Sequence, residues 1–150
     1  MLNILPYVVF IPGVSKGNEY KQWQPDKFAK IAKYCELKNY NICVIGTKMD
    51  FESVKPIIES CKNVINKLDS SPPEIIYSIA NKSSLIITND TGPGHVSSLS
   101  NKNIIWMLND NSISKANVEN ITTNHKIISK SLKSISHEKV IEYIEKNKLL

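Results

Sequence analysis

The residues best suited to chemistry lie in the segment Leu85-Ile86-Ile87-Thr88-Asn89-Asp90-Thr91-Gly92-Pro93-Gly94-His95. A run of apolar and β-branched residues ends in a polar turn, where Gly92 and Gly94 let the backbone approach a ligand without an intervening Cβ. A helix that begins here would direct unpaired N–H groups and its positive end toward an anion. The spacing therefore predicts a phosphate or diphosphate site at the end of a buried strand.

The same segment also has an interpretation that needs no ligand. Asp90 or Thr91 can cap the helix in an ordinary strand-to-helix turn. The segment lacks the three glycines of the dinucleotide fingerprint and the Gly-Lys-Ser/Thr end of a Walker loop. The motif alone leaves both interpretations open, so other features of the chain must separate them.

Length and charge limit the classes of protein to which this chain can belong. With 150 residues, the chain suits one domain with one core over residues 1–150. All 19 basic residues are lysines spread along the chain, so the net charge of +5 does not indicate nucleic-acid binding, which favours clustered arginines. The apolar stretch Ile4 to Ile11 contains Pro6 and is too short to span a bilayer. We expect no transmembrane segment and a cytoplasmic protein.

Cysteine and histidine spacing does not predict a metal site. The three cysteines are odd in number, lack C-x-x-C spacing and predict buried reduced thiols: Cys35, Cys43 and Cys61. The three histidines lack the i, i+4 or Cys/His spacing of a zinc site: His95, His125 and His137. We therefore expect no metal and no cofactor.

Short apolar runs alternate with amphipathic ones along the chain. The expected strands are Tyr7–Ile11, Asn41–Ile45, Val64–Ile65, Leu85–Thr88 and Asn103–Leu108. The expected helices start at Pro25, at Phe51, within Ser70–Glu74, at His95 and at Ser136. The stretch from Asn109 to Asn124 has little periodicity and predicts a surface loop.

Strands of this kind, apolar nearly throughout and alternating with helices, predict a parallel sheet with helices on both faces. This is a Rossmann-like α/β fold. Its ligands bind beyond the carboxyl ends of the strands. The candidate segments therefore follow the first, second and fourth strands: Pro12 to Trp23, Gly46 to Asp50 and Asn89 to His95.

These segments carry a resemblance to a known family. Lys21-Gln22-Trp23-Gln24-Pro25 and above all Asn89 to His95 resemble the carboxyl-terminal half of the heptosyltransferases, glycosyltransferase family 9. Pro12-Gly13, Ile45-Gly46 and the tail Leu132 to Val140 are also similar to it, so the resemblance extends from about Tyr7 to the last residue. It implies one half of a GT-B enzyme, the half that holds a nucleotide-diphosphate sugar, commonly ADP-heptose.

The resemblance implies a donor site built without a metal. The expected donor-binding residues are Ser15, Lys21, Asp90, Thr91, Gly92, Gly94 and His95. Amides, hydroxyls and the Lys21 ammonium would meet the charge that develops on the diphosphate leaving group. Asp90 would accept hydrogen bonds from sugar hydroxyls, and His95 would donate to a phosphate or to the sugar. Lys21 also has an ordinary interpretation as a solvated lysine, and Asp90 and His95 as helix-capping residues. We interpret Trp23 as a packing anchor rather than a base-stacking platform.

The chain departs from the family pattern in three places. The loop that carries Lys21 contains extra residues, Gly17-Asn18-Glu19-Tyr20. After the second strand it has Gly46-Thr47-Lys48, with Asp50 a little later, where the family has an acidic residue near Gly-x-x. After the fifth strand it has Met107-Leu108-Asn109-Asp110, where the family has Phe-Gly-Pro-Thr. The last two differences leave open the ribose contact and the identity of the nucleotide base.

The resemblance does not extend to the amino-terminal half of the family, which binds a lipopolysaccharide core sugar as acceptor and carries the carboxylate of an inverting transfer. We therefore expect donor binding with no catalytic residue in this chain, and transfer only together with an acceptor-binding half. Two alternatives are a non-catalytic nucleotide-sugar-binding module and a structural remnant or interaction domain. Apolar surface exposed where the other half would dock favours a partner subunit or self-association.

Overall fold

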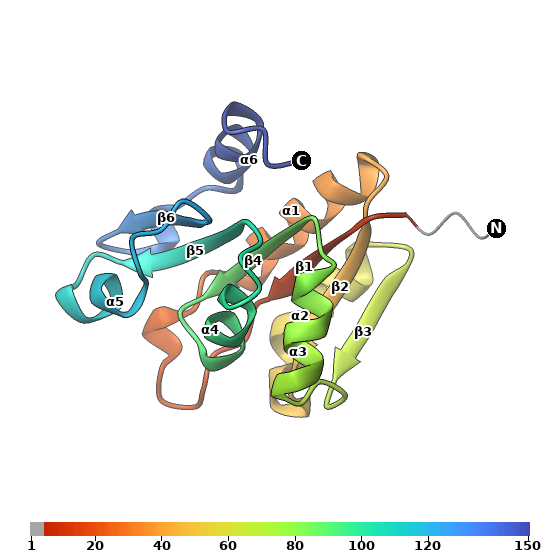
Figure 1. Cartoon of the computed structure of the whole chain (residues 1–150), viewed down its shortest axis with the longest axis horizontal. Helices are drawn as coiled ribbons and strands as arrows, with labels where there is room; N and C mark the ends of the chain where they lie inside the picture. The colour runs from red at the N-terminus through yellow and green to blue at the C-terminus, as the bar shows by residue number, and fades with distance from the viewer. Residues whose placement is uncertain (1–4) are drawn as a thin grey trace.

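A six-stranded parallel sheet forms the centre of the structure. This computed structural model describes residues 5–150, apart from the side chains of residues 112, 114 and 115. Within that range the strand order is β3-β2-β1-β4-β5-β6 (Figure 1). The strands are β1 Tyr7–Ile11, β2 Asn41–Gly46, β3 Val64–Leu68, β4 Leu85–Asn89, β5 Ile104–Asn109 and β6 Asn124–Ser129.

Helices cover both faces of this sheet, which confirms the Rossmann-like α/β fold predicted from the sequence. Helices α1, α2 and α6 supply buried residues to one face, and α3 supplies them to the other, beside α4. The helices are α1 Pro25–Leu37, α2 Phe51–Ser60, α3 Pro73–Asn81, α4 Gly92–Ser98, α5 Ser112–Asn117 and α6 His137–Lys146. Short 3-10 turns span Glu19–Lys21, Lys48–Asp50 and Leu132–Ser134.

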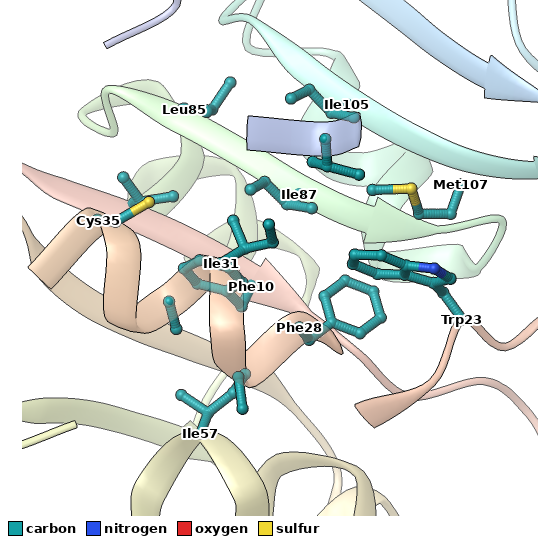
Figure 2. Packing of buried hydrophobic residues seen from close by; sticks show 14 of the residues in the cluster. Phe10, Trp23, Phe28, Ile31, Cys35, Ile57, Leu85, Ile87, Ile105 and Met107 are labelled. Carbon is teal, nitrogen blue, oxygen red and sulfur yellow. The ribbon is translucent and has the colours of Figure 1, made fainter. Parts of the chain in front are cut away.

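The larger core lies between the sheet and α1 (Figure 2). Alternate residues of β1 and β4, among them Phe10 and Ile87, meet α1 there because side chains along a strand point to opposite faces. Trp23 is fully buried, its ring is 5.0 Å from that of Phe28 at 76°, and its Nε1–H donates to the Ile135 carbonyl at 2.9 Å. Trp23 is therefore a packing anchor, as the sequence predicted.

The strand order reverses between β1 and β4. From β1 the chain proceeds outward through β2 and β3, and from β4 it proceeds to the other side through β5 and β6. The loops that leave β1 and β4 therefore separate at their carboxyl ends and leave a crevice, which is where ligands bind in open parallel sheets. This topology brings two of the three candidate segments together.

The structure differs from the sequence prediction at the edges of the sheet. Strand β6 was not predicted, and β3 continues past the predicted Val64–Ile65 to Leu68. The expected surface loop from Asn109 to Asn124 contains the short helix α5. Helix α4 begins at Gly92 rather than at His95, because the turn residues already have helical backbone geometry.

The three cysteines are free and buried, which confirms the prediction for them. Burial raises the pKa of Cys35 to about 12 and the pKa values of Cys43 and Cys61 to about 11. These thiols therefore remain protonated and unreactive near neutral pH. Separately, no helix in the described part of the chain is long and apolar enough to cross a membrane.

Candidate functional site

The site begins at the carboxyl end of β4, where Asn89 joins two distant parts of the chain. Its side chain is fully buried. Its Oδ1 accepts a hydrogen bond from the Trp23 backbone N–H at 3.0 Å, and its Nδ2 donates to the Pro12 carbonyl at 2.9 Å. The loop that carries Ser15 and Lys21 is thereby attached at both ends to β4.

Asp90, Lys21 and His95 form a charged cluster beside that attachment. The Asp90 side chain is only 4% exposed, and its Oδ1 lies 2.8 Å from His95 Nε2. Its other oxygen, Oδ2, lies 3.4 Å from the Lys21 Nζ, within ion-pair distance. This buried Oδ2 accepts no hydrogen bond within the described part of the chain. Lys21 thus neutralises the carboxylate while Oδ2 retains the capacity to accept a donor.

The surroundings of Asp90 keep it ionised. The hydrogen bond with His95 is the largest cause that lowers the pKa of the Asp90 carboxyl below its ordinary value, and burial opposes it. The Lys21 charge and a hydrogen bond with the Asn117 side chain add to the lowering. A carboxylate with a depressed pKa stabilises the folded state at neutral pH and loses that contribution as the pH falls through its folded pKa. The cluster is therefore an acceptor and a cation held together at neutral pH.

The first turn of α4 follows Asp90 directly. The first backbone bond of this turn runs from the His95 N–H to the Thr91 carbonyl at 3.1 Å, so the N–H groups of Thr91, Gly92 and Gly94 precede it and have no intrahelical acceptor. A Cβ on Gly94 would lie 2.7 Å from Thr88 Oγ1, whereas a Cβ on Gly92 would meet nothing within 4 Å. Gly94 is therefore required by internal packing, and Gly92 faces open space.

A cavity of about 300 Å³ lies at the carboxyl ends of β1, β2 and β4. Its walls combine apolar side chains with hydroxyls, one lysine and one carboxylate, from Ile11, Gly13, Val14, Ser15, Lys16, Gly46, Thr47, Met49, Asp50, Thr91 and Pro93. The Asp50 Oδ2 accepts from the Thr47 N–H at 2.8 Å. A Cβ on Gly13 would lie 2.1 Å from the Asp50 Oδ1, so glycine is needed there to admit the carboxylate.

The structure brings the residues predicted for the site to one end of the sheet. Ser15 and Thr91 line the cavity, and Lys21 and His95 both meet Asp90. Gly92 and Gly94 occupy the turn that connects these two groups. The sequence motif predicts the same role for both glycines, close approach of the backbone to a ligand, but the surroundings of their missing Cβ atoms differ.

Sequence reasoning did not assign a role to Asn89, which is the attachment point of the Lys21 loop. A signal existed, because an asparagine at the end of an otherwise apolar buried strand needs partners. The sequence does not decide whether Asp50 contacts a ligand, and the structure places Asp50 in the wall of the cavity. Among the described residues no cluster of three or more His, Cys, Asp or Glu could hold a metal ion.

The parallel sheet, with its crevice at the reversal of strand order, defines the class of fold: a Rossmann-like α/β unit. Escherichia coli ADP-heptose lps heptosyltransferase II is 21% identical, with a TM-score of 0.82 over 99% of this chain and 47% of that one. A family 9 glycosyl transferase from Veillonella parvula is 20% identical, with a TM-score of 0.83 over 97% of this chain and 47% of that one. E. coli heptosyltransferase WaaC with ADP is 16% identical, with a TM-score of 0.76 over 95% of this chain and 44% of that one.

The family is shown by the sequence itself. The model of glycosyltransferase family 9 (heptosyltransferase) matches residues 3–144, so the chain belongs to this family, as the motifs predicted. The chain spans about half the length of the solved structures that it matches. No curated protein sequence matches it significantly.

Proposed function

We propose that this chain binds a nucleotide-diphosphate sugar of the ADP-heptose kind and serves as the donor-binding half of a family 9 glycosyltransferase. The observation that carries the proposal is the Asp90 carboxylate, buried beside the Lys21 ammonium with one oxygen that accepts no hydrogen bond in the described chain. A buried oxygen without a hydrogen bond is costly in a protein on its own. A sugar hydroxyl would supply the missing donor once a covering side chain moves aside, because this oxygen is shielded from solvent.

The diphosphate would bind next to this carboxylate. The Lys21 ammonium, the Ser15 and Thr91 hydroxyls and the N–H groups of the first α4 turn are the donors available there. Charge-assisted hydrogen bonds of this kind are shorter and stronger than neutral ones. They would stabilise the diphosphate most when it carries the charge of a leaving group, so departure of the nucleotide needs no metal here.

Gly92 supports the same placement. No neighbour within 4 Å of its missing Cβ explains why this position is a glycine, and its φ is not positive. A phosphate that approaches the Gly92 N–H would occupy that space. His95 would act mainly through Asp90, since its Nε2 is already 2.8 Å from the carboxylate.

Transfer itself needs groups that this chain does not offer in our proposal. An inverting transfer requires a base that deprotonates the acceptor hydroxyl. In the proposed site Asp90 is used for holding the donor, and Asp50 Oδ2 accepts from the Thr47 N–H. We propose that an acceptor-binding half supplies the base, and that the reaction adds a heptose to a lipopolysaccharide or surface glycan. The names of the similar structures, ADP-heptose lps heptosyltransferase II among them, support this setting.

Ligand binding to the isolated chain tests the proposal. We expect ADP and ADP-sugars to raise the melting temperature in the presence of EDTA, because a ligand at 100 times its Kd adds about 2.7 kcal/mol of stability. UDP and GDP serve as base controls. Lys21→Ala should weaken ADP binding by about 10- to 100-fold, since hydrogen bonds to charged groups contribute about 1.5–3 kcal/mol.

Lys55→Ala is the matched control, because Lys55 lies on the surface of α2, with its Nζ 4.0 Å from Glu59 Oε1. It should leave the affinity for ADP unchanged. An absence of stabilisation by any nucleotide diphosphate would refute donor binding and favour a structural remnant. Binding without sugar transfer, even with an acceptor-binding half present, would instead favour a non-catalytic module.

A further inference from the structure

The buried Asn89 carboxamide is placed to control Lys21, although it lies outside both the cavity and the charged cluster. Lys21 belongs to a loop that leaves β1 at Pro12 and enters α1 after Trp23. Asn89 is bonded to the backbone at both of those ends, with distances of 2.9 Å to the Pro12 carbonyl oxygen and 3.0 Å to the Trp23 nitrogen. One side chain therefore closes the loop.

We propose that Asn89 is a positioning residue, which holds the loop so that the Lys21 ammonium stands against Asp90 at the start of α4. Asn89 is the last residue of β4, and Asp90 is the next residue in the chain. The same short segment therefore carries the carboxylate and fixes the backbone that presents its cation. The relative position of Lys21 and Asp90 is set by Asn89.

A carboxamide suits both of these bonds at once. Trp23 offers a backbone N–H and needs an acceptor, while Pro12 offers a carbonyl and needs a donor. An asparagine presents both groups from one planar side chain, and the two partners fix its orientation. A carboxylate at this position would lack the donor for the Pro12 carbonyl. An aliphatic side chain would make neither bond.

Two further amide groups brace the residues on either side of Lys21. Gln22 Nε2 donates to the Pro12 carbonyl at 3.0 Å, so that oxygen accepts from both Gln22 and Asn89. Asn109 Nδ2 donates to the Tyr20 carbonyl at 2.6 Å. The backbone around Lys21 is thus attached to β1, β4 and β5, and the Lys21 side chain is only 19% exposed.

The experiment first measures the position of Lys21 without any ligand. Its rate of acetylation, followed by peptide mass spectrometry, is compared in each folded variant with that of Lys55, whose side chain is 48% exposed. We expect Lys21 to react slowly in the wild type and several-fold faster in both Asn89→Leu and Asp90→Asn. The double variant should react no faster than Asp90→Asn alone, because both changes release the same ammonium.

Asn103→Leu is the matched control for the loss of an asparagine. Asn103 precedes β5, and its Oδ1 lies 3.1 Å from His125 Nε2, away from the loop. If Asn89 had only a structural role, Asn89→Leu would destabilise the fold without selectively raising the acetylation rate of Lys21. That is the result we expect for Asn103→Leu. An unchanged Lys21-to-Lys55 ratio in Asn89→Leu would overturn the inference.

A conservative variant keeps the test decisive if Asn89→Leu does not fold. Asn89→Asp retains an acceptor for the Trp23 N–H and loses the donor to Pro12. Lys21 should then become more reactive than in the wild type at neutral pH. An unchanged Lys21-to-Lys55 ratio in a folded Asn89→Asp variant would count against the proposal.

The consequence for ligand binding rests on the proposed function. With ADP as the ligand, Asn89→Leu should lower the affinity by about as much as Lys21→Ala, and combining them should add little. Additive losses would overturn the positioning role. If the wild type does not bind ADP, the proposed function fails, while the acetylation ratios still decide the role of Asn89.

Discussion

The central strands β1 and β4 differ from the edge strands β3 and β6 in what their side chains contact. Every residue of β4 is buried, as are all of β1 except Tyr7. In β3 and β6 only Ile127 is buried. Both edges carry a lysine within the strand, Lys67 and Lys126, which is a common protection against pairing with other chains.

This difference explains where the candidate site lies. The two central strands are fixed by neighbours on both sides and by helices on both faces, so the segments that leave them start from rigid positions. Lys21 and Asp90 come from these two segments. A site that depends on an ion-pair distance benefits from rigid supports, which the edges of the sheet do not offer.

The largest difference should appear when the same residue is truncated in a central and an edge strand. Ile87 in β4 is fully buried, whereas Ile65 in β3 is 39% exposed. Ile87→Ala should destabilise the protein by about 2–5 kcal/mol, because it removes buried methyl groups and leaves a cavity. Ile65→Ala should cost clearly less. Urea unfolding of both variants measures the difference, and equal losses would show that the edge is as tightly packed as the centre.

The contrast also explains how much could be predicted from the sequence. β4 begins as an uninterrupted run of Leu, Ile and Thr, so the sequence predicts both the strand and the turn that follows it. β6, Asn-His-Lys-Ile-Ile-Ser, has only two adjacent apolar residues, because one edge and part of its surface remain in contact with solvent. No local pattern distinguishes such a strand from a loop.

The candidate site shows the same limit. A motif identified Asp90 and Lys21, but their 3.4 Å separation depends on the order β1-β4, which pairs strands that are distant in sequence. The role of Asn89 required its two backbone partners, at sequence separations of 66 and 77 residues. Pairings of this kind follow from topology and not from local spacing.

The two glycines after β4 should separate stability from ligand binding at the centre of the sheet. Gly94→Ala would bring a methyl group to 2.7 Å from Thr88 Oγ1 and 3.1 Å from the Trp106 ring. We expect it to lose about 1–3 kcal/mol of stability through overpacking. Gly92→Ala places its methyl group in open space and should keep the wild-type stability, yet weaken ADP binding. Thermal unfolding and calorimetric titration of both variants check this, and a stability loss in Gly92→Ala would show that an internal contact, rather than a ligand, requires this glycine.

The smallest expected effect concerns pH at the β6 edge. His125 Nδ1 lies 2.9 Å from the Tyr143 hydroxyl, and burial lowers the pKa of the His125 imidazole below its ordinary value. Because the unfolded chain then binds this proton more readily, the contribution of neutral His125 to stability is complete above about pH 6.5 and is lost as the pH falls through the folded pKa.

Denaturant unfolding measures this loss. The free energy of unfolding of the wild type should fall between pH 7 and 5, by less than the limit of about 1.4 kcal/mol per pH unit for one proton. His125→Asn should lose less over that interval. Asp90→Asn should lower the stability at neutral pH without changing this slope, and should alter the shape of the curve only below about pH 4, where the Asp90 contribution is lost in the wild type. The edge and the centre of the sheet would then respond in separate pH ranges, and identical curves for His125→Asn and the wild type would contradict the assignment of the upper range to His125.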